Sequence, residues 1–252
     1  HAAGGESGPG RASGSGPGRT RGPSPGGAGR PGSGGPGRRP GSGGHAHTGG
    51  SGMRTAGQGP GGFEKRDGFM KPGQDLVMAG FTGLAGTRRI GQYKREELET
   101  HFSPMFLRCL DQTEDISVKQ WMECEAAQGR CPVSSYEYAG EGGVLAALWN
   151  LSGIFNAGID VDLRSFPIRQ ITVEVCELYE LNPYRLLCGN CVVMAADRGG
   201  QLVRRLSAQG IQAAVIGCVT EGIARQVRHG EEAAGYLERP KPDELLKIVT
   251  TI

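Results

Sequence analysis

The sequence predicts an α/β (α+β) domain of alternating strands and helices, preceded by a long low-complexity tail. Two observations lead to this fold class. After about residue 67, short apolar runs of strand character alternate with stretches whose apolar residues recur at helical spacing. Before that point the chain is rich in glycine, proline, serine and arginine, and 25 of its 45 glycines precede Phe63.

Residues 1–66 form this tail and are predicted to be disordered. The first 62 residues contain no Leu, Ile, Val, Phe, Trp or Tyr, so they cannot bury enough apolar area to offset the entropy of folding. They carry seven arginines against one glutamate. RNA binding is the functional alternative, although no aromatic residue is interleaved to stack on bases. A gene-calling artefact with Met53 as the true start, or a fragment that begins at His1, also fits the composition.

Cysteine usage and hydropathy favour a cytoplasmic protein. The seven cysteines are odd in number and scattered through apolar stretches, which favours reduced thiols over a disulfide framework. No apolar run reaches the roughly 18 residues expected of a membrane span, and the N-terminus lacks the apolar core of a secretory signal. The part after the tail is net acidic, which gives no reason to expect a nucleic-acid surface there.

The first half of the domain is expected to begin with a buried strand at residues 75–79. A helix start is signalled by Ser103 as the N-cap and Pro104 at the first helical position. In this half, helices are predicted at residues 87–99, 104–113 and 119–128.

The second half has the most regular pattern. Its glycine turn at residues 140–143 follows a predicted strand and precedes apolar residues at helical spacing, namely Val144, Leu148, Leu151 and Phe155. A later helix is expected to open at Ser165 and Pro167. Strands are predicted at residues 131–138, 159–163, 191–196 and 213–219, helices at 144–158, 197–208 and 243–248, and a hairpin around 229–231.

The glycine turn at residues 140–143 is the strongest candidate for a ligand site. Its glycines are expected to leave backbone N–H groups unobstructed, and a helix N-terminus favours an anion such as phosphate. A tight strand-to-helix connection that merely needs small residues fits this short motif equally well. Glu141 counts against phosphate unless its side chain points away.

The other polar residues carry weaker signals. Cys188 and Cys191 form a lone Cys-x-x-Cys without a second pair or a nearby His, which favours a buried structural pair over redox or metal chemistry. Arg169 and Glu174 could reach a ligand, against the default of a solvated helix face. Neither a catalytic residue nor a metal site is identified.

An ordered series of motifs runs from Gly140 to Gly222: GEGGVLAALWN, GIDVDL, FPIRQITVEVCELYELNPY and AVIGCVTEG. Together with KPGQD and GLAGT near the start of the domain, the series resembles the C-terminal domain of the aminoimidazole ribonucleotide (AIR) synthetase superfamily over about residues 69–248. The group that it resembles is the AIR-synthase-related proteins. This resemblance implies a PurM-like C-terminal domain at residues 67–252, with a mixed sheet and helices packed on it.

In that superfamily an N-terminal domain supplies most of the ATP and metal site, while the C-terminal domain offers its glycine turn to a phosphorylated substrate. The resemblance therefore implies ATP and Mg as cofactors, although the residues that would bind them are mostly absent from this chain. It also implies a small phosphorylated or nucleotide-like ligand, and a homodimer or a complementary ATP-binding chain as partner. The implied ligand-binding residues are Gly140, Glu141, Gly142, Gly143 and Asn182.

Two departures from the family pattern leave the function open. Tyr138 and Gly140 stand where the family pattern Asp-x-Thr/Ser-x-Gly-Gly has a carboxylate and a hydroxyl. The chain ends in VTTI, without the terminal cysteine that the hydrogenase-maturation enzyme of the superfamily uses. One hypothesis is an incomplete ATP-dependent enzyme, inactive as this chain alone. The alternative is a non-catalytic binding or assembly module with the same fold.

Overall fold

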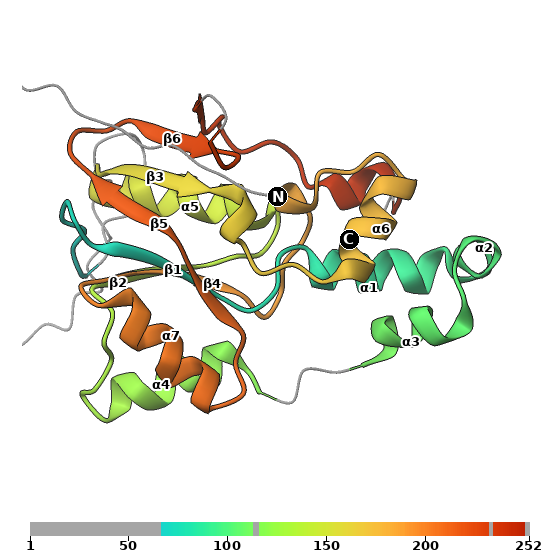
Figure 1. The fold of residues 1–252 in the computed structure, drawn as a ribbon, viewed down its shortest axis with the longest axis horizontal. Coiled ribbons are helices and arrows are strands. Elements are labelled where there is room, and N and C mark those ends of the chain that lie inside the picture. The colour runs from blue at the N-terminus through green and yellow to red at the C-terminus, as the bar shows by residue number, and fades with distance from the viewer. Residues whose placement is uncertain (1–66, 113–115, 232–233, 250–252) are drawn as a thin grey trace, which may run out of the picture. The chain divides into compact units, whose positions relative to one another are not determined.

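The computed structural model describes residues 67–112, 116–231 and 234–249, which form a mixed sheet covered by helices (Figure 1). The predicted α/β class is therefore confirmed. The predicted disorder at residues 1–66 lies outside the described residues.

Seven strands form the sheet in the order β2-β4-β1-β5-β3-β6-β7. β3 and β6 run parallel, whereas the other neighbouring strands are antiparallel. The predicted hairpin around residue 229 is confirmed as the β6–β7 pair. The bounds are β1 Asp75–Ala79, β2 Ser135–Tyr138, β3 Gly158–Asp162, β4 Val192–Ala196, β5 Ala213–Thr220, β6 Arg225–Arg228 and β7 Gly235–Tyr236.

The helices are α1 Leu84–Tyr93, α2 Arg95–His101, α3 Pro104–Asp111, α4 Val118–Ala127, α5 Gly143–Phe155, α6 Gln170–Leu178 and α7 Gly199–Ala208. Short 3-10 turns lie at η1 Leu163–Ser165, η2 Pro183–Arg185 and η3 Glu244–Lys247. None of the helices in the described ranges is long and apolar enough to cross a membrane.

The central strand β1 contributes to a hydrophobic core on each face of the sheet. Leu76 and Met78 pack in a cluster with residues of α5, whereas Val77 and Ala79 pack with residues of α4 and α7. Successive side chains of a strand point to opposite faces, so one short strand supports both layers. Figure 1 shows α4 and α7 together on one side of the sheet.

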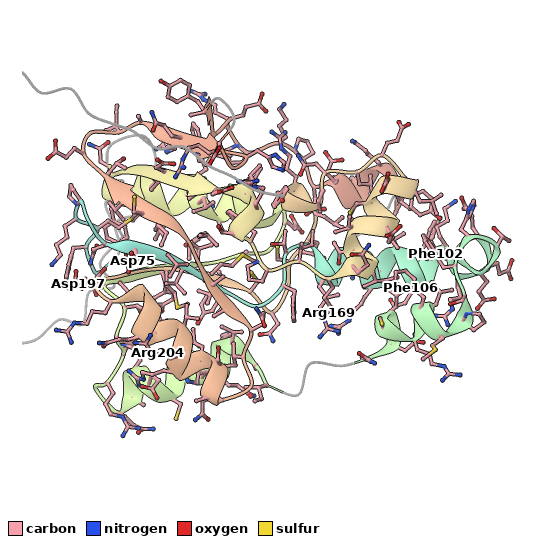
Figure 2. All side chains as sticks on the ribbon, in the orientation of Figure 1. Asp75, Phe102, Phe106, Arg169, Asp197 and Arg204 are labelled. Carbon is pink, nitrogen blue, oxygen red and sulfur yellow. The ribbon has the colours of Figure 1, made fainter. Side chains whose placement is uncertain are left out.

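A third hydrophobic cluster lies beyond the end of the sheet, where α1, α2, α3 and α6 gather (Figure 1). Figure 2 shows Phe102 and Phe106 in this group, with ring centroids 5.4 Å apart. Leu245 of η3 is fully buried in the same cluster. The C-terminal segment is therefore anchored against these helices.

Several predicted boundaries were wrong. The helix expected at residues 87–99 is divided into α1 and α2 at Lys94, whose φ of −115° and ψ of 28° are not helical. The helix expected to open at Ser165 and Pro167 begins at Gln170. Asp162 caps the 3-10 turn before it, since its side chain accepts a hydrogen bond from the amide of Arg164, and Phe166, the residue before Pro167, is extended.

Three further boundary predictions can be judged. Of the strand expected at residues 131–138, only the second half is a strand, which is β2. The predicted Ser103 cap is confirmed, since its Oγ accepts from the amide of Phe106 at 3.3 Å. The strand expected at residues 191–196 is confirmed as β4, with all five residues buried.

Candidate functional site

The turn at residues 140–143 connects β2 to α5 through two glycines in the left-handed region. Gly142 has φ 73° and Gly143 has φ 69°. A Cβ on Gly143 would lie 2.4 Å from the carbonyl oxygen of Tyr184, because η2 packs directly on the start of α5. This backbone conformation and this close approach both require glycine.

The first amides of α5 are hydrogen-bonded within the chain. The Gly142 N–H donates to Oδ2 of Asp243 at 2.7 Å, and the Gly143 N–H donates to the carbonyl of Gly140 at 3.2 Å. The Val144 N–H is directed to the sulfur of Cys188. The expectation of unobstructed amides was therefore wrong, since the fold brings Asp243 from 101 residues away.

Asp243 is a buried carboxylate held by backbone amides. The side chain accepts from Gly142 through Oδ2, and from Leu187 at 3.2 Å and Leu245 at 2.9 Å through Oδ1. The residue is only 6% exposed. Among the described residues, no lysine, arginine or histidine forms an ion pair with it. Amide hydrogen bonds therefore take the place of water around this carboxylate.

Two further contacts hold the C-terminal segment against η2. Arg185 of η2 pairs with Glu238 at 2.5 Å, and within the C-terminal segment Lys241 pairs with the same carboxylate at 2.7 Å. The hydrogen bonds and charges of Lys241 and Arg185 lower the pKa of Glu238 to about 2. The amide of Asn182 donates to Glu244 at 3.3 Å. The turn at residues 140–143, η2 and the C-terminal segment are thus held together by these contacts.

The implied ligand-binding residues lie on two adjoining turns. Gly140 is half-buried and its carbonyl accepts from the amides of Gly143 and Cys188. Glu141 is exposed. The side chain of Asn182 accepts from the amide of Tyr184 at 3.0 Å, which is the structural role that a turn-forming residue before proline has. Phosphate binding at these residues stays a prediction, and a phosphate there would compete with Asp243.

Cys188 lies where the starts of α1 and α5 meet. Its sulfur accepts from the amide of Gly83 at 3.4 Å, and both Cys188 and Cys191 are almost fully buried. The hydrogen bond from Cys191, assisted by the amides of Gly83 and Val144, lowers the pKa of the Cys188 thiol against the opposing effect of burial. The contacts of this pair serve packing and capping of the two helices.

A separate cavity of about 490 Å³ is lined by residues at the ends of β1, β4 and β5, with Arg169 as its one charged lining residue. The guanidinium lies 4.5 Å from the ring centroid of Phe81, and Figure 2 shows Arg169 between the sheet and the helical group. Glu174, by contrast, bonds to Gln170 on the exposed side of α6. Of the two predicted candidates, Arg169 and Glu174, only Arg169 lines this cavity.

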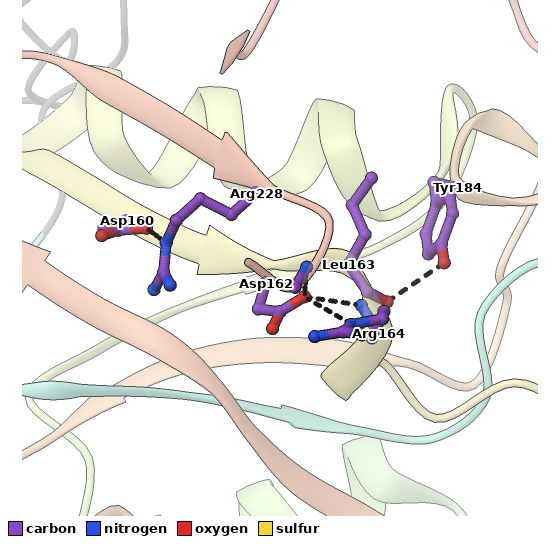
Figure 3. Close-up of polar contacts among 7 residues, drawn as sticks. Asp160, Asp162, Leu163, Arg164, Tyr184 and Arg228 are labelled. Atoms are coloured by element: carbon purple, nitrogen blue, oxygen red, sulfur yellow. Dashed lines mark hydrogen bonds and ion pairs between the residues drawn. The ribbon is translucent and has the colours of Figure 1, made fainter. Parts of the chain in front are cut away.

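A polar cluster ties β3 to β6 (Figure 3). Arg228 donates to Asp160 at 2.7 Å, and Asp162 accepts from the amides of Arg164 and Gly230 at 3.0 Å each. These two amide hydrogen bonds lower the pKa of Asp162. The Tyr184 hydroxyl donates to the carbonyl of Leu163 at 3.0 Å, and this hydrogen bond links the polar cluster to η2. These contacts hold the edge of the sheet in register.

The described residues contain no group of three or more His, Cys, Asp or Glu side chains placed to hold a metal ion. His101 and His229 are both exposed.

Solved structures with the same fold include hydrogenase maturation proteins called HypE. E. coli HypE matches with a TM-score of 0.57 and 20% identity, covering 71% of this chain and 54% of HypE. A HypE solved in complex with ATP matches with a TM-score of 0.55 and 14% identity, covering 73% and 55%. HypE in a HypE–HypF complex matches with a TM-score of 0.54 and 17% identity, covering 68% and 54%.

These matches show that the described residues have the same fold as the HypE structures, in agreement with the α/β class that the sequence predicted. The chain spans about half the length of the HypE structures that it matches. No protein-family model matches the chain, and no curated protein matches it.

Proposed function

We propose that residues 67–252 form the substrate-facing C-terminal domain of an AIR-synthase-related protein, with the turn at residues 140–143 directed at an oxyanion of a small phosphorylated or nucleotide-like ligand. The observation that carries this proposal is the carboxylate of Asp243, whose oxygens bond to the amides of Gly142 and Leu187 from two separate parts of the chain. A phosphate presents oxygens of the same kind to backbone amides, and a helix N-terminus stabilises either anion.

The proposal includes ATP and Mg only because of the likeness of fold. HypE has been solved in complex with ATP, but the described residues of this chain contain no carboxylate cluster suited to a metal. We therefore assign no ATP-binding residue here. A second chain, either another copy or a complementary ATP-binding protein, would supply that half of the site; a partner chain is present in the HypE–HypF complex.

The proposed location is the cytoplasm. The seven cysteines are all free thiols in the structure, which supports a reducing compartment.

The test uses the full chain with millimolar Mg-ATP, followed by thermal unfolding and by release of inorganic phosphate. The enzyme-domain proposal predicts that the melting temperature rises with nucleotide concentration, because a ligand that binds only the folded state stabilises it. It also predicts that ATP turnover appears only when the complementary ATP-binding chain is added. A folded chain whose melting temperature ignores Mg-ATP, alone and with that partner, would contradict the proposal.

The second candidate is a non-catalytic binding or assembly module. The carboxylate of Asp243 also supports this second candidate, because a turn that Asp243 fills permanently has no place for substrate. This candidate predicts partner-dependent stabilisation of the fold without any response to nucleotide or phosphate, with or without Asp243. Removal of the Asp243 side chain therefore separates the two candidates.

A further inference from the structure

Arg169 is a half-buried cation that lines the cavity of about 490 Å³ at the ends of β1, β4 and β5. Among the described residues, its side chain forms neither an ion pair nor a hydrogen bond. Its guanidinium lies over the ring of Phe81, at 4.5 Å from the centroid. An aromatic face attracts a cation but leaves its five N–H donors without an acceptor. These donors can therefore bind an anion in the cavity.

Apolar and polar groups share the walls of this cavity. Val118 and Ile211 are 2% and 4% exposed and belong to the core between the sheet and the helices α4 and α7. Ser207 and Gln212, by contrast, are exposed. The buried part of the lining is therefore apolar, and polar side chains lie on its solvent side.

Two contacts hold the walls in place. The side chain of Asn190, just before β4, accepts from the amide of Val118 at 2.7 Å and donates to the carbonyl of Ile116 at 2.9 Å, which fixes the start of α4 beside the sheet. Phe81 holds the guanidinium of Arg169 by the cation–π contact. A site whose groups are already positioned loses less conformational entropy when a ligand binds.

We infer that this cavity is a second ligand site, which binds a small organic monocarboxylate: Arg169 binds the carboxylate, and the apolar body of the ligand packs against Val118 and Ile211. A guanidinium matches a carboxylate through two parallel hydrogen bonds. Arg169 is the one charged residue of the lining, so a dianion such as a phosphate monoester would bring a second, uncompensated charge.

This inference goes beyond the proposed function. None of the residues that line the cavity belongs to the turn at residues 140–143. The volume is within the range of roughly 300–1,000 Å³ that is usual for small-molecule sites. Either site can therefore be present without the other, and the experiments on each give independent results.

The experiment titrates phenylacetate into the full chain and follows the amide NMR shifts of Phe81 and Ile211. Phenylacetamide has the same shape without the charge, acetate has the charge without the ring, and inorganic phosphate is the competing anion. We expect phenylacetate to bind at least about 10-fold more tightly than each of these three, because a hydrogen-bonded charge and a buried ring each contribute more than 1 kcal/mol. Equal binding of phenylacetamide, or tighter binding of phosphate, would overturn the inference.

Arg169→Gln should weaken phenylacetate binding by at least about 10-fold, and Arg169→Lys should restore only part of it, because lysine keeps the charge and loses the planar fork. Arg204→Gln is the matched control. Arg204 is an exposed residue of α7, and Figure 2 shows it well apart from Arg169. We expect no change in this control, and an equal loss in Arg204→Gln would mean a general effect of net charge and would contradict a specific site.

Ser207→Trp is a second variant, which leaves Arg169 in place. Ser207 is an exposed residue in the last turn of α7 that lines the cavity, so a tryptophan there can fill the cavity with little effect on the core. We expect this variant to lose phenylacetate binding while its melting temperature stays close to that of the wild type. Undiminished binding in folded Arg169→Gln and Ser207→Trp, or the absence of binding to the wild type, would overturn the inference.

Discussion

The turns that start α1 and α5 have nearly the same backbone but bond to different acceptors. Gly83 has φ 66° and ψ 5°, and Gly142 has φ 73° and ψ 4°. At α1 the Gly83 amide donates to the sulfur of Cys188 at 3.4 Å, and the next amides donate to main-chain carbonyls, as Gly86 does to Leu187 at 2.8 Å. At α5 the Gly142 amide donates to a side chain, the carboxylate of Asp243.

The two N-cap amides therefore bond to side chains of different kinds, a buried thiol at α1 and a carboxylate at α5. A main-chain acceptor can leave only if the loop that carries it moves, whereas a carboxylate leaves by rotation about its own side-chain bonds. The α1 turn has two such main-chain acceptors, the carbonyls of Cys188 and Leu187, in addition to the thiol. Glycine spacing alone does not distinguish them.

The largest effect is expected from Gly143→Ala. The new Cβ would lie 2.4 Å from the Tyr184 carbonyl oxygen at a φ of 69°, so the substitution combines a backbone clash with a left-handed conformation. We expect a loss of about 3 kcal/mol or more in the free energy of unfolding. Chemical denaturation measures it.

Gly140→Ala is the control in the same turn. Nothing lies within 4 Å of its added Cβ and its φ is not left-handed. A change within about 0.5 kcal/mol is expected. If Gly140→Ala destabilised the chain as much as Gly143→Ala, the close approach of η2 would not be the cause.

Gly83→Ala and Gly142→Ala compare the two turns directly. Both changes incur the left-handed cost of about 1–2 kcal/mol. At Gly83 the Cβ would also lie 2.8 Å from the Pro183 carbonyl oxygen, whereas at Gly142 it would meet the Ala146 side chain at 3.0 Å. We expect Gly83→Ala to be the more destabilising by denaturant midpoint; the reverse order would show that the α5 turn is the more rigid one.

The smallest effect is expected from Glu238→Gln, which weakens the ion pairs beside the α5 turn only. Folding lowers the pKa of Glu238 to about 2, chiefly through Lys241 and then Arg185. A lowered folded-state pKa contributes stability above the unfolded value of about 4.3, and this contribution is lost as the pH falls toward 2. The melting temperatures of wild type and Glu238→Gln should therefore converge across that range. A constant difference down to pH 2.5 would contradict an ionic role.

Local patterns in the sequence were sufficient to predict much of the fold. The alternation of apolar runs placed β1 and β4, the spacing from Val144 to Phe155 placed α5, and Ser103 placed the start of α3. Each of these signals depends on neighbours within one helix turn or one strand.

The candidate site could be predicted only in part. The glycine turn was found because it lies between a strand and a helix, but its partner Asp243 is 101 residues away and its second donor, Leu187, contributes a main-chain amide with no side-chain signature. The late start of α6 was missed because the residues around Pro167 are extended: Phe166 has φ −74° and ψ 129°, and Arg169 has φ −87° and ψ 145°.

The peptide group between Leu187 and Cys188 joins the two turns physically. Its carbonyl accepts from Gly86 at the start of α1, and its N–H donates to the carbonyl of Gly140 before α5 at 3.4 Å. A peptide group is a rigid plane, so its two ends rotate together. A tilt of α5 would therefore be transmitted to α1, and a changed rate of solvent exchange at the Gly86 amide would report a movement at the opposite turn.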